Sequence, residues 1–153
     1  MTLAVQSFDS MPTQIIDVLG GQKAFRQPID SFLSFIAATE KGFPISVAQR
    51  IQKQLELSNK QFSQMLNLSE STFQRRIKSQ SALSAGESEK VVDLSKIIAK
   101  GLDVFENEND LKVWLNSPIL ALGSKKPIEL LSYSIGREEI LNVLFRIEHG
   151  IFS

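Results

Sequence analysis

One short stretch of the chain, Leu66 to Lys78 (L-N-L-S-E-S-T-F-Q-R-R-I-K), carries hydroxyls and cations at a spacing that suits nucleic-acid recognition. In an α-helix, where each residue turns by about 100°, Ser71, Arg75 and Lys78 share the side that faces away from the apolar residues. Hydroxyls at the start of such a helix can approach base edges, and an arginine one turn later can pair with guanine O6 and N7. The stretch therefore predicts a helix that lies in the major groove of DNA.

The polar side chains of this region divide into candidate base readers and candidate phosphate binders. Ser71 and Thr72 can exchange hydrogen bonds with bases, and the Thr72 methyl can touch a thymine methyl. Arg76 lies nearer the core edge, so we expect its stem to pack while its guanidinium reaches outward to phosphate. The alternative is that Ser71, Arg75 and Lys78 simply form a solvated helix face. The candidate DNA-binding residues are Ser71, Thr72, Gln74, Arg75, Arg76, Lys78, Lys60 and Lys53.

Two short capped helices joined by a tight turn are predicted to position these side chains. Ser58 can cap the first helix and Ser69 the second, and Asn67 between them tolerates the left-handed backbone that a sharp turn requires. Phe73 and Ile77 are the pair that we expect the second helix to bury. This arrangement matches a helix-turn-helix.

The rest of the chain also predicts helices. No segment alternates apolar and polar residues with β-branched enrichment, so we expect an all-α fold. An apolar stripe on the longest helix is a candidate dimer seam, although it can equally be buried within one chain. The expected helices cover 13–19, before Gly20 and Gly21; 32–39, capped by Asp30 or Ser31; a segment capped by Ser46; a long segment from a capping box at Ser84 and Glu87 to near Asn107; a segment capped by Asn109 and stopped at Pro118; a segment that begins at Pro127; and 137–149, followed by Gly150.

The composition bounds the partners that the chain can have. Its 153 residues hold 17 Lys and Arg against 17 Asp and Glu, so the net charge favours no partner. The charge is uneven, because residues 1–79 hold nine cations and six anions (+3) and residues 80–153 hold eight cations and eleven anions (−3). The absence of cysteine excludes disulfides and thiolate metal sites. Since no apolar run reaches the roughly 18 residues of a membrane span, we expect a cytoplasmic protein with no membrane partner.

Catalytic chemistry finds little support in the residue types. His149 is the only histidine, and a lone histidine makes no metal site. Glu138 and Glu139 are adjacent, but neighbours on a helix point about 100° apart and do not converge on one proton or metal. Gly20-Gly21 lacks the spacing and the lysine of a phosphate-binding loop. We therefore expect no enzyme and no cofactor.

Several segments together resemble the Xre/MbcA/ParS-type antitoxins. The helix-turn-helix register L-E-L-S-N-K-Q-F-S-Q-M-L-N-L-S-E-S-T-F-Q-R-R is shared by many repressors. More telling are W-L-N-S-P, then G-S-K-K-P-I-E-L-L, and a final helix that ends in I-E-H-G. Ser63 and Asn67 depart from the alanine and glycine that such helices often carry. The resemblance extends from about Phe43 to Ser153.

The resemblance implies a function for each part of the chain. A bacterial antitoxin of this type dimerises, represses its own operator through the helix-turn-helix and holds a RES-domain toxin, which consumes NAD, inactive through its C-terminal domain. It would work in the cytoplasm, at the nucleoid when bound to DNA. The expected domains are an N-terminal arm with short helices (1–42), the helix-turn-helix region with a long connecting helix (43–106) and a small helical toxin-binding domain (107–153).

The end of the chain is a candidate toxin contact. After Gly150 ends the last helix, the apolar pair Ile151 and Phe152 has little core left to join. We expect this tail to enter the toxin, because a pocket for the NAD pyrophosphate must present cations that can hold the terminal carboxylate. The alternative is that the apolar pair folds back as a plug on the last helix or on a second copy. The candidate toxin-binding residues are Glu148, His149, Gly150, Ile151, Phe152 and Ser153.

Three hypotheses stay open at the level of sequence. The first is the antitoxin, a repressor and toxin inhibitor in one chain. The second is a stand-alone helix-turn-helix transcriptional regulator whose C-terminal helices serve dimerisation or ligand sensing. The third is an interaction protein whose helix-turn-helix has lost DNA binding, which the neutral net charge favours.

Overall fold

The regular structure of the protein is helical. The computed structural model describes residues 13–151, and within that range every regular element is a helix. The predicted all-α fold is therefore confirmed. None of the helices in this range is long and apolar enough to cross a membrane. Extended backbone pairs only at two isolated bridges of the described range, Pro44 with Ala82 and Ile119 with Lys125.

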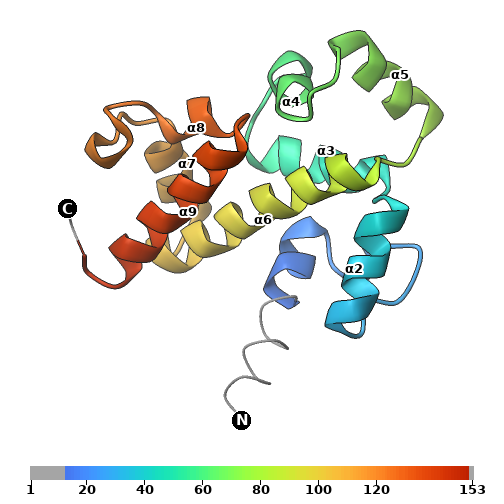
Figure 1. Cartoon of the computed structure of the whole chain (residues 1–153), viewed down its shortest axis with the longest axis horizontal. Coiled ribbons are helices and arrows are strands. Elements are labelled where there is room, and N and C mark those ends of the chain that lie inside the picture. The colour runs from blue at the N-terminus through green and yellow to red at the C-terminus, as the bar shows by residue number, and fades with distance from the viewer. Residues whose placement is uncertain (1–12, 152–153) are drawn as a thin grey trace. The chain divides into compact units, whose positions relative to one another are not determined.

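The chain divides into two compact units, Met1–Ser95 and Lys96–Ser153. The boundary falls within the longest helix, α6 (Ala85–Phe105), which Figure 1 shows as one continuous ribbon. The division into domains at 42/43 and 106/107 stays a prediction.

The first unit packs its helices around phenylalanines and branched aliphatic residues. Phe43, Phe62 and Phe73 are almost completely buried. The rings of Phe25 and Phe35 meet that of Phe43 edge-on, with centroids 5.3 and 6.1 Å away. The elements of the unit are a helix over residues 13–19, η1 (Gln22–Ala24), α2 (Phe32–Lys41), α3 (Ile45–Gln54), α4 (Asn59–Met65), α5 (Glu70–Ser79) and the first half of α6. Within the unit, α5 contacts both α3 and α4.

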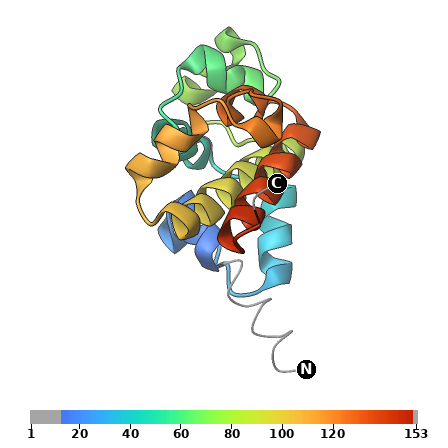
Figure 2. The ribbon, with the colours of Figure 1, turned by 90° about the vertical axis from the view of Figure 1, so that its left-hand side faces the viewer.

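The second unit has its own core, to which Leu111, Ile140 and Leu144 contribute fully buried side chains. Figures 1 and 2 both show α9 running beside the second half of α6, and Lys100 of α6 forms an ion pair with Glu148 of α9. The elements that complete the unit are α7 (Glu108–Leu115), η2 (Leu120–Leu122), α8 (Pro127–Leu130) and α9 (Ser134–Glu148).

The apolar stripe of α6 is buried within the chain. Val91, Leu94 and Ile98 are each at most 2% exposed. Gly101, one turn further on, is also buried, and a Cβ built there would lie 2.3 Å from Leu111 Cδ1. The candidate dimer seam on α6 is therefore wrong, because its side chains already serve the cores of the protomer.

Most of the predicted helix caps are present. The side chain of Ser31 caps α2 in a capping box, and Pro127 begins α8. Ser84 and Glu87 form the expected reciprocal pair at the start of α6, since Ser84 donates its backbone N–H to Glu87 Oε1 at 2.8 Å and Glu87 donates its own to Ser84 Oγ at 3.1 Å. These residues fix the helix boundaries locally, as the sequence indicates.

Two caps were assigned to the wrong residue. Helix α3 begins at Ile45 with Pro44 before it and no side-chain cap, so Ser46 lies inside the first turn. The backbone of Phe43 explains this start, because its N–H donates to Ser88 Oγ and its carbonyl accepts from the Leu83 N–H, both of which fix the chain before Pro44. Helix α7 is capped by Asn107 rather than Asn109, since α6 ends early.

Helix α9 starts three residues before the predicted Arg137. It begins at Ser134 and passes through Gly136, a residue that usually weakens a helix interior. Glycine is required there by packing, because a Cβ at Gly136 would lie 2.2 Å from the Leu130 carbonyl oxygen. That close approach is a tertiary feature that the local pattern does not reveal.

Candidate nucleic-acid interface

The turn between α4 and α5 is closed by backbone hydrogen bonds around a left-handed residue. Asn67 has φ 59°, as predicted for this position. Its N–H donates to the Gln64 carbonyl at 3.1 Å, and the Leu68 N–H donates to the Ser63 carbonyl at 2.9 Å, which together form a Schellman motif. Asparagine thus performs the role of the glycine that such turns often carry, and the turn keeps its usual form.

Helix α5 starts at the predicted cap and is held by one main anchor. Ser69 Oγ accepts the Thr72 N–H at 3.1 Å. Phe73 is completely buried and its ring lies 5.7 Å from that of Phe62 in α4. Ile77, the other predicted anchor, is only half-buried. The pair is therefore unequal, and the first half of α5 is fixed more firmly by the core than the second.

The hydroxyls at the start of α5 form a small hydrogen-bonded group, in which Ser71 Oγ lies 3.3 Å from Ser69 Oγ. Ser71 is exposed and Thr72 is half-buried. Ser69 Oγ donates to Thr72 Oγ1 at 2.8 Å, so the hydroxyl hydrogen of Thr72 remains for another acceptor. Gln74 is exposed, and its amide nitrogen lies 3.4 Å from Glu70 Oε1, a long contact that a better acceptor can replace.

Four of the predicted cations reach solvent without a partner in the described part of the chain. Arg75 and Lys78 lie on the outward side of α5, opposite Phe73, as the helical spacing predicts. Neither they nor the exposed lysines of α3 and α4 form an ion pair with any described residue. We call Lys53, Lys60, Arg75 and Lys78 the outward cations.

Arg76 departs from its predicted orientation. Its guanidinium forms an ion pair with Glu87 Oε1, and the side chains of the two residues are 27% and 10% exposed. The same carboxylate oxygen accepts the Ser84 N–H in the capping box of α6. The head of Arg76 therefore turns toward the core side and joins α5 to the start of α6, instead of reaching outward to phosphate.

The last turn of α9 has a fixed geometry. Gly150 has φ 70° and donates to the Ile147 carbonyl, and Ile151 donates to the Arg146 carbonyl at 2.8 Å. These bonds form another Schellman motif, which confirms Gly150 as the residue that ends the helix. Ile151 is 52% exposed, so its side chain is not a plug on the core of this chain. Phe152 and Ser153 lie outside the described residues.

The side chains before Gly150 form a small polar and aromatic group. The His149 ring stacks on that of Phe145 with centroids 4.2 Å apart, and His149 Nδ1 lies 2.9 Å from the Phe145 carbonyl oxygen. The hydrogen bond from Lys100 lowers the pKa of the Glu148 carboxyl below its usual 4.5. Glu148 is therefore already paired within the unit, whereas Ile151 is available to a partner.

Sequence reasoning missed a second exposed apolar region in this unit. Leu120 is 88% exposed, Tyr133 62% and Ile135 79%. Leu120 belongs to η2 and Ile135 to the start of α9, two elements that contact each other. Large apolar side chains so exposed are typical of a protein-protein contact. The apolar run I-L-A-L-G could have predicted this region, because a solvent-exposed loop of a protein without a partner is usually polar.

These features define a two-part helix-turn-helix protein. The second helix of the motif presents hydroxyls and cations, and a separate helical unit carries exposed apolar residues. Residues 34–95 match the family model of the antitoxin Xre-like helix-turn-helix domain, and residues 100–150 match that of the antitoxin Xre/MbcA/ParS C-terminal toxin-binding domain. The chain belongs to the Xre/MbcA/ParS-type antitoxins, and this family is not one of enzymes.

Named relatives agree with this membership. Antitoxin Xre of Photorhabdus laumondii is 25% identical over 118 residues, covering 76% of this chain and 80% of the relative. The Prs ADP-ribosylating antitoxin of Sphingobium sp. is 28% identical over 127 residues, covering 77% and 80%. A chain in the crystal structure of the M. tuberculosis MbcT-MbcA toxin-antitoxin complex matches 71% of this chain and 96% of its own length with a TM-score of 0.51. Its identity of 19% makes this a likeness of fold alone.

Proposed function

We propose that this antitoxin represses its own operator through α5 and holds a RES-domain, NAD-consuming toxin inactive through its C-terminal unit. The observation that carries the proposal is the outward side of α5, where an exposed hydroxyl at Ser71 is followed by unpaired cations at Arg75 and Lys78. This surface belongs to a chain whose other unit matches a toxin-binding domain. Both activities therefore have a structural basis in one molecule.

On DNA, the hydroxyls and Arg75 read bases and the lysines position the helix. Arg75 pairs with guanine, and Thr72 donates its free hydroxyl hydrogen to a base acceptor. Gln74 exchanges its long contact with Glu70 for a base edge or a phosphate. Lys78, Lys60 and Lys53 contact phosphates, whereas Arg76 acts indirectly by fixing α5.

On the toxin, two regions of the C-terminal unit supply the contacts. The tail, from Glu148 through His149 and Gly150 to Ile151, Phe152 and Ser153, presents an exposed apolar side chain directly after a rigid helix end. In this proposal the tail enters the cationic pocket that holds the NAD pyrophosphate. The exposed Leu120, Tyr133 and Ile135 form the second contact and bury apolar area against the toxin.

The antitoxin acts as a homodimer in the bacterial cytoplasm, at the nucleoid when it binds DNA. A two-fold dimer places its two α5 helices in successive major grooves, which requires half-sites about 34–36 Å apart. The operator is therefore an inverted repeat with half-sites about one helical turn apart. Shifting the two half-sites by 5 base pairs, about half a turn, should abolish binding by the dimer.

Co-expression with the cognate RES-domain toxin tests the toxin half of the proposal. The full chain should keep the cellular NAD level normal, and a chain shortened by Ile151 to Ser153 should lose protection. The control is Val113→Ala, because Val113 is 58% exposed in the same unit and belongs to neither proposed contact. Circular dichroism and operator binding verify that the shortened chain is folded.

Each outcome has a separate meaning. Full protection by the folded, shortened chain rejects insertion of the tail and leaves the region around Tyr133 and Ile135 as the toxin contact. Lack of protection by the full chain, with operator binding intact, favours a stand-alone helix-turn-helix regulator. Protection without operator binding favours the interaction protein that has lost DNA binding. In that last case, affinity for any DNA should show no steep loss as salt rises.

A further inference from the structure

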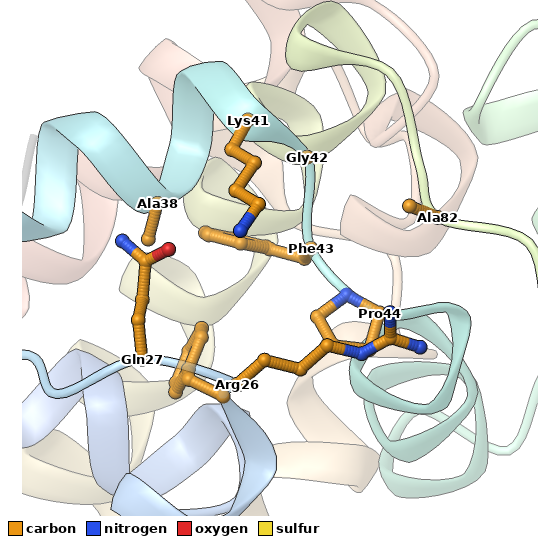
Figure 3. Close-up of a pocket in the computed structure, with 9 residues that line it drawn as sticks. Arg26, Gln27, Ala38, Lys41, Gly42, Phe43, Pro44 and Ala82 are labelled. Atoms are coloured by element: carbon orange, nitrogen blue, oxygen red, sulfur yellow. The ribbon is translucent and has the colours of Figure 1, made fainter.

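A small pocket in the first unit is not used by either proposed activity. It lies where the end of α2 meets the loop before α2 and the chain after α5, and Figure 3 shows the residues that line it. Its volume is about 80 Å³, several times the roughly 10–15 Å³ that a water molecule needs. The pocket is open to solvent on one side, so an occupant larger than the cavity can project from it.

The walls of the pocket are apolar and rigid. Phe43 is 1% exposed, and Phe25 packs edge-on against it at 5.3 Å. The backbone beside them is tightly packed, since a Cβ at Gly42 would lie 1.9 Å from the Leu83 carbonyl oxygen. Because these side chains and the backbone are already fixed, the cavity exists before any ligand arrives.

The occupant of the pocket would touch both ends of the helix-turn-helix. Pro44 directly precedes α3, and Ala82 lies between α5 and α6. These two residues also form one of the isolated bridges. A ligand seated against them therefore contacts the chain on either side of the DNA-binding segment.

Two cations stand at the rim without partners. Arg26 and Lys41 are exposed, and within residues 13–151 neither side chain forms a hydrogen bond or an ion pair. No acidic residue lines the pocket. Figure 3 shows the amino end of Lys41 beside the Phe43 ring and the side chain of Arg26 running toward Pro44. The charge at the rim therefore favours an anion, and the walls favour an apolar body.

We propose that this pocket binds a small organic anion whose carboxylate is carried on a flat apolar group. The apolar group enters the cavity beside the partly exposed Phe25 and Pro44 and is thereby removed from water. The carboxylate stays at the rim, where the Arg26 guanidinium donates a pair of hydrogen bonds and the Lys41 ammonium donates a third. The ligand needs both the apolar group and the carboxylate. A neutral ring makes no ion pair with Arg26 or Lys41, and a small anion without a ring does not cover the apolar walls.

Titration of the full-length protein with benzoate, followed by the backbone amide resonances, tests the proposal. Benzoate should shift the amides of Gly42, Phe43 and Ala82 in a saturable way, with a Kd on the order of 1 mM for so small a probe. Benzamide, which has the same shape without the charge, should bind at least about tenfold more weakly. Acetate, which has the charge without the ring, should produce no saturable shift at these residues.

Variants identify the two halves of the site. Arg26→Gln and Lys41→Gln should each weaken benzoate binding about tenfold, and Ala82→Leu should block the pocket from its exposed rim. Lys23→Gln is the matched control, because Lys23 is an exposed cation of the same unit outside the pocket. Equal binding of benzamide and benzoate, equal losses for Lys23→Gln and Arg26→Gln, or no saturable shift with any probe would overturn the proposal. Unchanged amide spectra of the variants without ligand establish that they fold.

Discussion

Arg75 and Arg76 are neighbours of one residue type on one helix, yet the structure places them in opposite surroundings. Arg75 is exposed and unpaired among the described residues, whereas Arg76 forms an ion pair with Glu87. Replacing each with alanine should therefore separate DNA recognition from stability. Arg75→Ala should damage sequence preference in a fully stable protein, and Arg76→Ala should damage stability with little direct effect on DNA contacts.

The size of each effect follows from burial and partners. Removal of Arg76 leaves the Glu87 carboxylate, 10% exposed, with the Ser84 N–H as its remaining donor. Loss of one partner from a buried pair costs about 3–5 kcal/mol, and a hydrogen bond to a charged group contributes about 1.5–3 kcal/mol. The Arg76 side chain is 27% exposed, so water reaches the pair and the cost should be below that of a fully buried pair. We therefore expect Arg76→Ala to lower the free energy of unfolding by about 2 kcal/mol, within the range for a hydrogen bond to a charged group. Arg75→Ala should change stability by less than about 0.5 kcal/mol.

Thermal unfolding and a binding titration on two DNAs measure the contrast. Arg76→Ala should lower the melting temperature by about 4–8 °C, and Arg75→Ala should leave it unchanged. Arg75→Ala should cost about 1–3 kcal/mol on the operator and much less on random DNA, because only the base contact is lost. Lys78→Ala, which removes a phosphate contact, should weaken both DNAs alike. Binding must be measured well below the lower melting temperature.

Either of two results would contradict these opposite effects of Arg75→Ala and Arg76→Ala. Equal losses on operator and random DNA for Arg75→Ala would show that Arg75 reads no base. An unchanged melting temperature for Arg76→Ala, together with a loss on DNA as large as that of Arg75→Ala, would show that the ion pair does not hold in solution. A cycle with Glu87→Gln isolates the pair, since Arg76→Ala should cost little once the carboxylate is gone.

Three further predictions concern packing, pH and salt. Gly101→Ala should cost about 1–3 kcal/mol in urea unfolding, because its Cβ meets the buried Leu111, whereas Gly86→Ala, which meets nothing within 4 Å, should be neutral or stabilising. The carboxyl resonance of Glu148 should titrate with a pKa below 4.5, and the pKa should return toward 4.5 in Lys100→Met. Because the pKa is lowered in the folded state, the pair with Lys100 stabilises the protein above about pH 4.5, and this stabilisation is lost as the pH falls through the folded pKa. In a dimer, each protomer places the three lysines of the outward cations on phosphates. A plot of the logarithm of operator affinity against the logarithm of salt concentration should therefore have a slope of about −5. A slope near zero would exclude DNA binding through these lysines.

The helix-turn-helix was predictable because its determinants are local. Ser58 and Ser69 cap helices three residues from the amides they accept, and the left-handed turn at Asn67 is closed by backbone hydrogen bonds to Gln64 and Ser63. Helical spacing alone places Phe73 inward and Arg75 outward. For these residues the cause lies within one turn of the chain, and the sequence indicated the feature correctly.

The features that escaped prediction have causes far along the chain. Arg76 turns inward because Glu87, eleven positions away, presents a carboxylate to it. Helix α3 starts at Ile45 because the backbone of Phe43 is held by residues that follow α5. Gly136 lies inside α9 without a side chain because the Leu130 carbonyl of α8 occupies the space that a Cβ would need. Local patterns carry no information about such neighbours, and so the sequence placed these boundaries and orientations wrongly.

The zero net charge of the chain hides a difference between cations that are paired within the protein and cations that face solvent. Arg76 and Lys100 form ion pairs with Glu87 and Glu148 that each join two helices, and Arg146 pairs with Glu139 within α9. All three pairs add nothing to the net charge. The outward cations form no such pairs among the described residues, so their field extends to solvent. A whole-chain average therefore underestimates the attraction of this surface for a polyanion. In the proposed function, affinity for DNA depends on how many cations remain unpaired on one side of the helix-turn-helix. We expect a carboxylate placed as close to Arg75 as Glu87 is to Arg76 to weaken DNA binding without changing the fold.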